Sequence, residues 1–437
     1  MEIDLLNYIK KYIGKVKSEI NMTQYNEAYS QKILLCIMVC CVMSCVFCGC
    51  GVNYEIKTKN DIDIASEYKE YALEGTVLKS EIVYDDTTKF PIRRYYFDDA
   101  NIHGGYVNNS LYIDDDTFYF LSDCNGSANI YLLESKNESI YQVTDTLNQD
   151  LYENVNSFGL TPCTANDSLF YSLENNIYRF NCKTKNSEKV IDSTIVGGEI
   201  WAPLYVTNDG KWISTTITKG DICYIARLNI DSKEIDYLES PFAGTKNATA
   251  NHAYINPQNP DLIMFAHEGS WVMDRVWFWK LNNQRDGGHA YNLFEQPEYT
   301  EMGHEVWSQD GTNVVIVQYG SPSRCISSGF NIINLEGEYV NQIKAPDGFY
   351  FNHVAVSPDG KFIVSDTFRP DEDDKRWIVL YSIEEKSFTK LASYESDNHP
   401  AHSHPYFSKS GNKIMYNNLV DGRLELNEID LRDIGVK

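Results

Sequence analysis

Apolar and polar residues alternate along this chain in short runs that follow tight turns, as in β-strands joined by hairpins. The clearest unit has an apolar or aromatic residue, a small polar residue, any residue, Asp-Gly and then an alternating strand. Two copies read Val206-Thr-Asn-Asp-Gly-Lys-Trp-Ile and Val356-Ser-Pro-Asp-Gly-Lys-Phe-Ile. Glycine accepts positive φ, so the Asp-Gly dipeptide predicts a tight turn before each strand.

This unit, including weaker copies, recurs seven times. The turn markers are Asp115, Asp167, Asp209, Asn259, Asp310, Asp359 and Ser410. A repeat of about 50 residues that contains several strands is typical of a β-propeller. We therefore predict an all-β fold, a seven-bladed β-propeller over residues 76–437. A β-helix or a tandem of sandwiches is the alternative.

The N-terminus differs from the repeats. Residues 33–48 are apolar except for one serine, which is short for a membrane span but suits the core of a signal peptide. A glycine then precedes Cys50, which resembles a bacterial lipobox with Cys50 lipidated, and Cys45 is a second fit. We predict that residues 1–50 are a signal peptide or an uncleaved membrane anchor. Residues 51–75 are then a polar linker, and the propeller lies outside the cytoplasm, attached to a membrane.

Composition excludes some classes of partner. The net charge of −24 argues against a nucleic-acid or anionic-membrane surface, which would need a basic face. It does not exclude an acidic substrate, because a metal and a few cations can invert the potential inside one cleft. Six of the eleven cysteines lie between Cys36 and Cys50 and the other five are scattered, so a disulfide framework is not predicted.

Histidines carry the candidate chemistry. Of nine in the chain, His304 lies in Gly-His-Glu-Val-Trp, and His399, His402 and His404 lie in His-Pro-Ala-His-Ser-His-Pro. These residues and His252 precede marker turns in three blades, and such equivalent positions tend to face the central channel of a propeller. Imidazole suits Mn, Fe, Zn, Ni or Cu, so the four predict a metal site.

Five short motifs, taken in order, resemble the oligogalacturonate lyase family over roughly residues 75–435. They are His252-Ala-Tyr-Ile-Asn-Pro, Phe265-Ala-His-Glu-Gly, Asp274-Arg-Val-Trp, Gly303-His-Glu-Val-Trp and His402-Ser-His-Pro. Members of this family are seven-bladed propeller enzymes with a manganese ion that act on short pectin fragments. The resemblance implies Mn²⁺ as the cofactor here.

The resemblance also implies residue roles. It makes His304, His402 and His404 metal ligands, and His252 the catalytic base. His399 stands where the family has a glutamine ligand, so a softer donor replaces an amide oxygen. The usual members are cytoplasmic, which does not match the predicted export segment.

An arginine about 25 residues before the base is another feature of the family. Arg227 has that spacing here and is the predicted second catalytic residue, although Tyr224 could occupy the place instead.

The implied reaction is β-elimination on an acidic oligosaccharide, an oligogalacturonide. The base removes the C5 proton next to the carboxylate, the 4-linked sugar leaves, and the metal and an arginine, Arg227 or Arg275, hold the carboxylate. Arg275, His267 and His353 are predicted to contact substrate. His267 and Arg275 could instead brace their blade. His103 and His289 are predicted surface residues.

Two other functions fit parts of the sequence. A non-enzymatic scaffold similar to periplasmic TolB-type propellers would explain the repeats and the export segment, but not the histidines. A propeller lyase for a different uronate glycan would explain both the repeats and the histidines.

Overall fold

In the computed structural model the described residues are 68–436, except for residues 74, 107–108, 148–149, 152–159, 161, 202, 244–248, 269–273, 282–287, 322, 324, 370, 372 and 397–400. The predicted signal or anchor segment, residues 1–50, lies outside this set, as does most of the predicted linker. No helix within the described set is long and apolar enough to cross a membrane.

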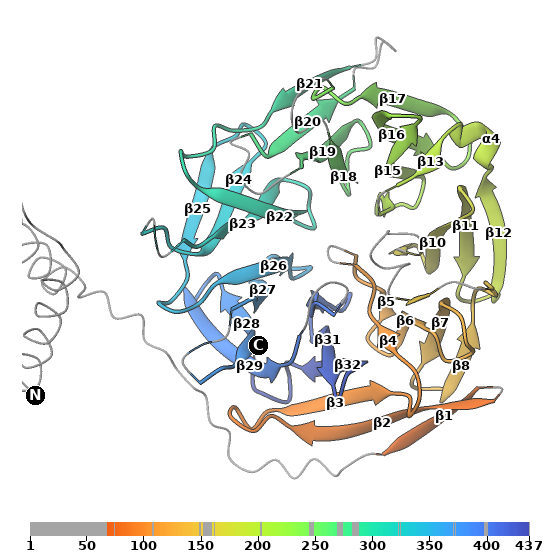
Figure 1. Cartoon of the computed structure of the whole chain (residues 1–437), viewed down its shortest axis with the longest axis vertical. Coiled ribbons are helices and arrows are strands. Elements are labelled where there is room, and N and C mark those ends of the chain that lie inside the picture. The colour runs from red at the N-terminus through yellow and green to blue at the C-terminus, as the bar shows by residue number, and fades with distance from the viewer. Residues whose placement is uncertain are drawn as a thin grey trace, which may run out of the picture. The chain divides into compact units, whose positions relative to one another are not determined.

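Seven antiparallel sheets form a ring, which confirms the predicted seven-bladed propeller (Figure 1). The first blade contains β4 (Ile102–His103), β5 (Tyr112–Asp114), β6 (Thr117–Ser122), β7 (Asn129–Glu134) and β8 (Ser139–Gln142). The second contains β9 (Cys163–Ala165), β10 (Ser168–Leu173), β11 (Asn176–Asn181) and β12 (Asn186–Ile191). A short helix, α4 (Ser193–Val196), leads to the third blade, which contains β13 (Glu199–Ile200), β14 (Tyr205–Val206), β15 (Trp212–Lys219), β16 (Ile222–Asn229) and β17 (Ile235–Glu239).

The remaining blades repeat this plan. The fourth contains β18 (Ala250–Ile255), β19 (Leu262–His267), β20 (Val276–Lys280) and β21 (His289–Asn292). The fifth contains β22 (Glu301–Trp307), β23 (Asn313–Tyr319), β24 (Gly329–Asn334) and β25 (Tyr339–Lys344). The sixth contains β26 (Phe351–Val356), β27 (Phe362–Thr367), β28 (Arg376–Ser382) and β29 (Ser387–Tyr394).

The seventh blade closes the ring by joining both ends of the propeller. It contains β30 (Tyr406–Phe407), β31 (Lys413–Val420) and β32 (Arg423–Asp430), followed by β3 (Pro91–Tyr96), β2 (Thr76–Tyr84) and β1 (Lys69–Leu73). Strand β3 pairs with β32, and Arg94 donates two 2.8 Å hydrogen bonds to the Glu425 carboxylate across that pair. The sheet therefore begins at Lys69 rather than at residue 76, because β1 and β2 extend the closing blade.

Side-chain hydrogen bonds explain the repeated turn sequence. In the sixth blade the Ser357 hydroxyl donates to Asp359 and accepts from the Phe362 amide, and the Lys361 amide also donates to Asp359. Gly360 has a φ of 71°, the left-handed conformation that the Asp-Gly dipeptide predicts. Each marker thus fixes where an inner strand turns into the next strand of its blade.

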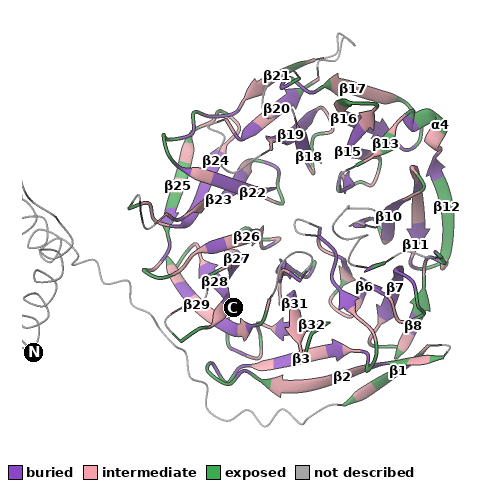
Figure 2. Ribbon diagram, viewed as in Figure 1, coloured by how far each residue is buried: buried purple, intermediate pink, exposed green. Residues whose placement is uncertain are grey.

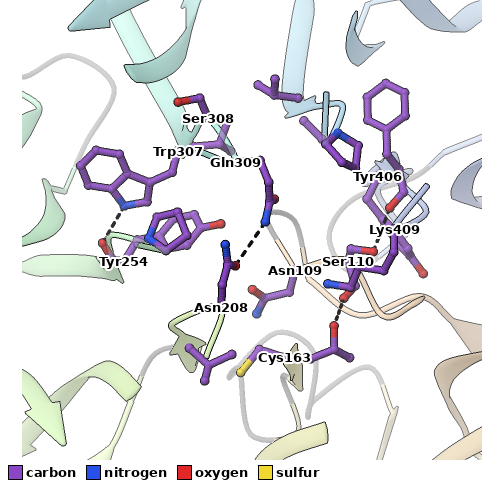
Figure 3. Close-up of a pocket in the computed structure, with 18 of the residues that line it drawn as sticks. Asn109, Ser110, Cys163, Asn208, Tyr254, Trp307, Ser308, Gln309, Tyr406 and Lys409 are labelled. Carbon is purple, nitrogen blue, oxygen red and sulfur yellow. Dashed lines mark hydrogen bonds between the residues drawn. The ribbon is translucent and has the colours of Figure 1, made fainter. Parts of the chain in front are cut away.

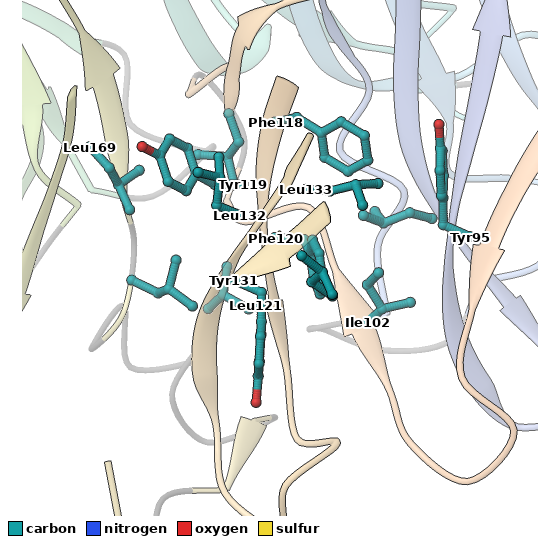
Figure 4. Packing of buried hydrophobic residues seen from close by; sticks show 14 of the residues in the cluster. Tyr95, Ile102, Phe118, Tyr119, Phe120, Leu121, Tyr131, Leu132, Leu133 and Leu169 are labelled. Atoms are coloured by element: carbon teal, nitrogen blue, oxygen red, sulfur yellow. The ribbon is translucent and has the colours of Figure 1, made fainter. Parts of the chain in front are cut away.

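The core runs around the ring between neighbouring sheets. Buried residues concentrate on the inner and middle strands, whereas outer strands such as β12 expose most of their residues (Figure 2). One aromatic cluster joins the first and second blades to the closing blade (Figure 4). Leu426 of β32 is fully buried in this cluster, so closure of the ring and packing of the core depend on the same strands.

We predict that Leu426→Ala lowers the free energy of unfolding by about 2 to 5 kcal/mol, because it removes a buried side chain and leaves a cavity in the closing blade. Chemical denaturation followed by circular dichroism measures this change. Leu147→Ala is the matched control, since the Leu147 side chain is 78% exposed and its truncation leaves no cavity. Equal loss of stability in the two variants would contradict the assigned importance of the closing blade.

Candidate active site

Four histidines occupy one equivalent position in four consecutive blades. His252, His304, His353 and His404 each stand three residues before the apolar residue that opens a marker turn. The first three lie on the first strands of the fourth, fifth and sixth blades, and His404 lies just before β30 of the seventh. The repeat therefore brings these four side chains to the same level of neighbouring blades.

A β-bulge lies at three of these positions, those of His252, His304 and His353. In β18 the pairing with β19 shifts between Asn251 and Tyr254, so His252 and Ala253 together oppose one residue. Strands β22 and β26 have the same two-against-one shift, at His304 and His353 respectively. An extra residue in one strand turns the side chain that would otherwise follow the pleat, and bulges commonly aim side chains at functional sites.

Backbone strain accompanies three of the four histidine positions. His252, His304 and His404 have φ angles of 50°, 53° and 44°, in the left-handed region that side chains other than glycine rarely adopt. Such conformations cost on the order of 1 to 3 kcal/mol each and persist where the surrounding structure imposes them. At His252 the neighbouring Asn251 carboxamide accepts a 2.7 Å hydrogen bond from the strained amide.

Three of the imidazoles converge on one point. Ligand nitrogens of His353, His402 and His404 lie within 4.8 Å of one another, a spacing that small side-chain movements bring within reach of a single ion. His304 is adjacent, with its ring centroid 4.3 Å from that of His353. His353 was predicted from sequence to contact sugar, and the structure adds it to the potential metal ligands. His399, the fourth predicted ligand, lies outside the described residues.

Hydrogen bonds to neighbouring groups orient the ring of His353. Asp366 accepts from both the backbone amide and the Nδ1 of His353, at 2.7 and 2.8 Å, and the Ser403 hydroxyl also donates to Asp366. The Asp366 carboxylate and the His353 ring are both almost fully buried. A carboxylate that binds one imidazole nitrogen fixes the tautomer and leaves the other nitrogen free for a metal.

His304 is held in a similar way. Its Nδ1 lies 2.6 Å from the Asn352 carbonyl, to which it donates, and 2.8 Å from the Tyr319 hydroxyl. This arrangement leaves Nε2 as the nitrogen with a lone pair. Burial, reinforced by neighbouring His353, lowers the pKa of His304 well below its usual value, and the same two causes lower the pKa of His402 to about 4. Both rings are therefore neutral near pH 7, the state in which imidazole binds metals.

His252 lies in a separate buried group of charges. Its Nδ1 is 3.6 Å from the carboxylate of fully buried Glu305, which also binds the Arg275 guanidinium at 3.1 and 3.3 Å. Arg275 contacts Glu268 as well. Burial lowers the pKa of His252, and the charges of Glu305 and Glu268 oppose that shift. On the other side, the Tyr106 hydroxyl lies 3.4 Å from His252 Nε2.

Tyr106 connects the two groups. Its ring packs edge-on against both His252 and His404, at centroid distances of 5.8 and 5.3 Å. Burial and the charge of Glu268 raise its pKa, so it keeps its proton at neutral pH. The sequence motifs did not single out Tyr106 because it precedes the first turn marker and lies in no repeated unit.

Two predicted site residues have other contacts in the structure. The Arg227 guanidinium binds Asp236, Asp261 and the Pro260 carbonyl, and it stacks on Trp212. Among the described residues, none of its contacts leads to the histidines. These contacts brace Arg227 within its own blade, and its predicted catalytic role stays a prediction.

His267 also contacts its own blade. Its ring stacks on Phe242 at 3.7 Å, and its Nδ1 lies 2.8 Å from Asp274. Its predicted contact with substrate stays a prediction. His103 was expected at the surface but is fully buried against His404, with Gly105 and Asn417 at its ring nitrogens. His289 is exposed, as expected.

A different pocket of about 120 Å³ lies among the marker turns (Figure 3). Asn208, Gln309 and Lys409 line it, and Gln309 donates a hydrogen bond to Asn208. None of the predicted site residues lines this pocket. The candidate chemistry therefore belongs to the bulged segments that precede the turns.

Comparisons with known proteins point to one family, although no protein-family model matches the chain. An oligogalacturonide lyase of Pectobacterium atrosepticum is 21% identical over 370 residues, which cover 74% of this chain and 89% of that protein. The solved structure of an oligogalacturonate lyase in complex with manganese has a TM-score of 0.67 at 19% identity, covering 84% of this chain and 98% of its own. An oligogalacturonate lyase structure from Vibrio parahaemolyticus has a TM-score of 0.66 at 18% identity, covering 81% and 96%. The resemblance to oligogalacturonate lyases that the histidine motifs predict is therefore confirmed over most of the propeller.

Proposed function

We propose that this protein is a metal-dependent lyase that cleaves oligogalacturonides by β-elimination. The observation that carries the proposal is the convergence of His353, His402 and His404 within 4.8 Å, beside the buried pair of His252 and Glu305. The similarity to oligogalacturonate lyases supports the substrate class. A scaffold without enzymatic activity has no need for neutral imidazoles held at a strained backbone.

The donor set fits a divalent ion. His402 and His404, together with His353 and the adjacent His304, would hold it through imidazole nitrogens, and His399 stays a predicted further ligand. Imidazole donors alone accept several transition metals, so manganese is proposed from the similarity to a manganese-containing lyase. When bound, such an ion neutralises the uronate carboxylate and stabilises the negative charge that develops as C5 loses its proton.

His252 is the proposed base. Burial lowers its pKa and keeps the ring neutral, so a lone pair is available at neutral pH. Glu305 beside Nδ1 favours a proton on that nitrogen and leaves Nε2 to accept the C5 proton. The same carboxylate stabilises the imidazolium that results, much as an aspartate does in a catalytic triad. Elimination then breaks the C4–O bond and leaves a C4–C5 double bond, the departing sugar oxygen gains a proton from water, and the His252 imidazolium returns its proton to solvent.

Arg275 holds Glu305 in place. Its guanidinium is 5% exposed and bound by Glu305 and Glu268, so its donors already face protein carboxylates. We propose that Arg275 positions the base through Glu305, and that its predicted direct contact with substrate is secondary.

A propeller lyase for another uronate glycan is the second candidate function, because the site chemistry is the same for any C5 proton next to a carboxylate. Export or membrane anchoring through residues 1–50 stays a prediction.

His252→Asn is expected to reduce kcat by about 10²- to 10⁴-fold on galacturonic acid oligomers, because it removes the general base. The measurement follows ultraviolet absorbance of the unsaturated uronate product in the presence of Mn²⁺. His289→Asn, at an exposed position, is expected to keep the wild-type rate.

The content of bound metal distinguishes the proposed roles of His252. Metal content equal to wild type in His252→Asn supports a base, whereas loss of metal would make His252 a ligand. If the wild-type protein releases no unsaturated product from any uronate oligomer, with or without added metal, the lyase proposal fails.

Asp366→Asn is expected to weaken metal binding by about 10- to 100-fold, because the charged acceptor that orients His353 is lost. Metal titration of the purified protein, with inductively coupled plasma mass spectrometry of bound Mn, measures the affinity. Asp347→Asn is the matched control, since that carboxylate is fully exposed. An unchanged affinity in Asp366→Asn would remove His353 from the proposed ligand set.

A further inference from the structure

A second pocket adjoins the histidine group and has a volume of about 510 Å³. His402 forms part of its wall. Other parts of the wall are Tyr319 and Asn352, which hold His304, and Asp366, which holds His353. A ligand that fills this pocket would therefore touch the proposed metal site directly.

Two arginines, Arg369 and Arg376, also line this pocket. The Arg369 guanidinium is exposed and stacks on the rings of Tyr350 and Phe368, at 4.7 and 5.1 Å. Arg376 is half-buried and donates to two backbone carbonyls, from Nε to Phe368 at 3.2 Å and from a terminal nitrogen to Ser396 at 3.4 Å. Aromatic stacking and carbonyl bonds fix both guanidinium planes without neutralising their charge.

Unlike Arg275 and Arg227, these two arginines are not paired with carboxylates of the described residues. Arg275 is bound by two carboxylates and Arg227 by two more. Within the part of the chain that the structure describes, no carboxylate lies at ion-pair distance from Arg369 or Arg376. The pocket also contains the carboxylates of Glu301 and Asp366, but neither of them lies at ion-pair distance from the two arginines.

We infer that Arg369 and Arg376 form a subsite for a second carboxylate of the substrate chain, next to the uronate that is cleaved. This inference rests on the proposed lyase function. An oligogalacturonide carries one carboxylate on each sugar, so a sugar bound at the metal site has a charged neighbour that needs a partner. A planar guanidinium matches a carboxylate with two parallel hydrogen bonds, and the half-bound Arg376 retains donors for them.

The subsite makes a prediction about chain length and affinity. Arg369→Gln and Arg376→Gln are each expected to raise KM for galacturonic acid trimers by about 10- to 100-fold with little change in kcat, because a charge-assisted contact outside the reacting bond contributes uniform binding. Arg376→Lys is expected to recover only part of the lost affinity, since lysine keeps the positive charge but cannot donate two parallel hydrogen bonds to a carboxylate. Bound Mn is expected to stay at the wild-type level.

Arg179→Gln is the matched control, because Arg179 pairs with Glu188 on the outer strands of the second blade. Calorimetric titration with the trimer and with its methyl ester, in the Mn-loaded His252→Asn background that does not cleave them, adds a readout without turnover. We expect this background to prefer the free acid and the added double substitution Arg369→Gln/Arg376→Gln to abolish that preference.

Failure of the subsite and failure of the lyase proposal are distinguishable. If the wild type cleaves the trimer, and the arginine variants show the wild-type KM and the wild-type preference for the acid, the subsite proposal is wrong while the lyase proposal stands. If no cleavage occurs but binding of the acid depends on the arginines, the subsite stands as a uronide-binding site alone. If the wild type neither cleaves nor binds the trimer, both are wrong.

Discussion

The two-residue bulge in three inner strands is the constraint that sets the level of the histidines in this site. A regular strand alternates its side chains between the two faces of a blade. The bulges at His252, His304 and His353 break that alternation at the same step of the repeat. Equivalent positions of successive blades lie side by side in a propeller, so histidines at the bulged position of several blades form one group of imidazoles.

Burial gives these imidazoles their chemical state. A histidine in water is half protonated near pH 6.5, whereas burial lowers the pKa of His304, His402 and His252 and keeps lone pairs available. Position then separates the proposed metal ligands from the proposed base, because His353, His402 and His404 converge within 4.8 Å whereas His252 lies beside Glu305. A carbonyl holds His304 in one fixed orientation. Glu305 beside His252 can instead stabilise a charge that appears only after proton transfer.

The turn residues along the sequence predicted the number of blades, because each marker turn is formed by hydrogen bonds within one short segment. The histidine positions followed from the same repeat. Closure of the ring by β1, β2 and β3 was not visible, since those strands carry no marker and pair with the far end of the chain. Arg227 shows a limit of spacing along the chain, which predicts a site residue but does not reveal that two carboxylates bind its guanidinium. Asp366 was missed because its partner lies on another strand.

The overall charge of −24 and a polyanionic substrate are compatible only if positive charge is concentrated and left available. Most buried or paired cations in this protein cannot serve that purpose, and Arg275 illustrates why, since Glu305 and Glu268 already surround it. Arg369 and Arg376 are held by rings and carbonyls, which orient a guanidinium but leave its charge intact. A site that orders its cations with neutral partners can attract an acidic sugar into an acidic protein, and the same neutral partners keep the cations from being drawn to the surrounding surface carboxylates.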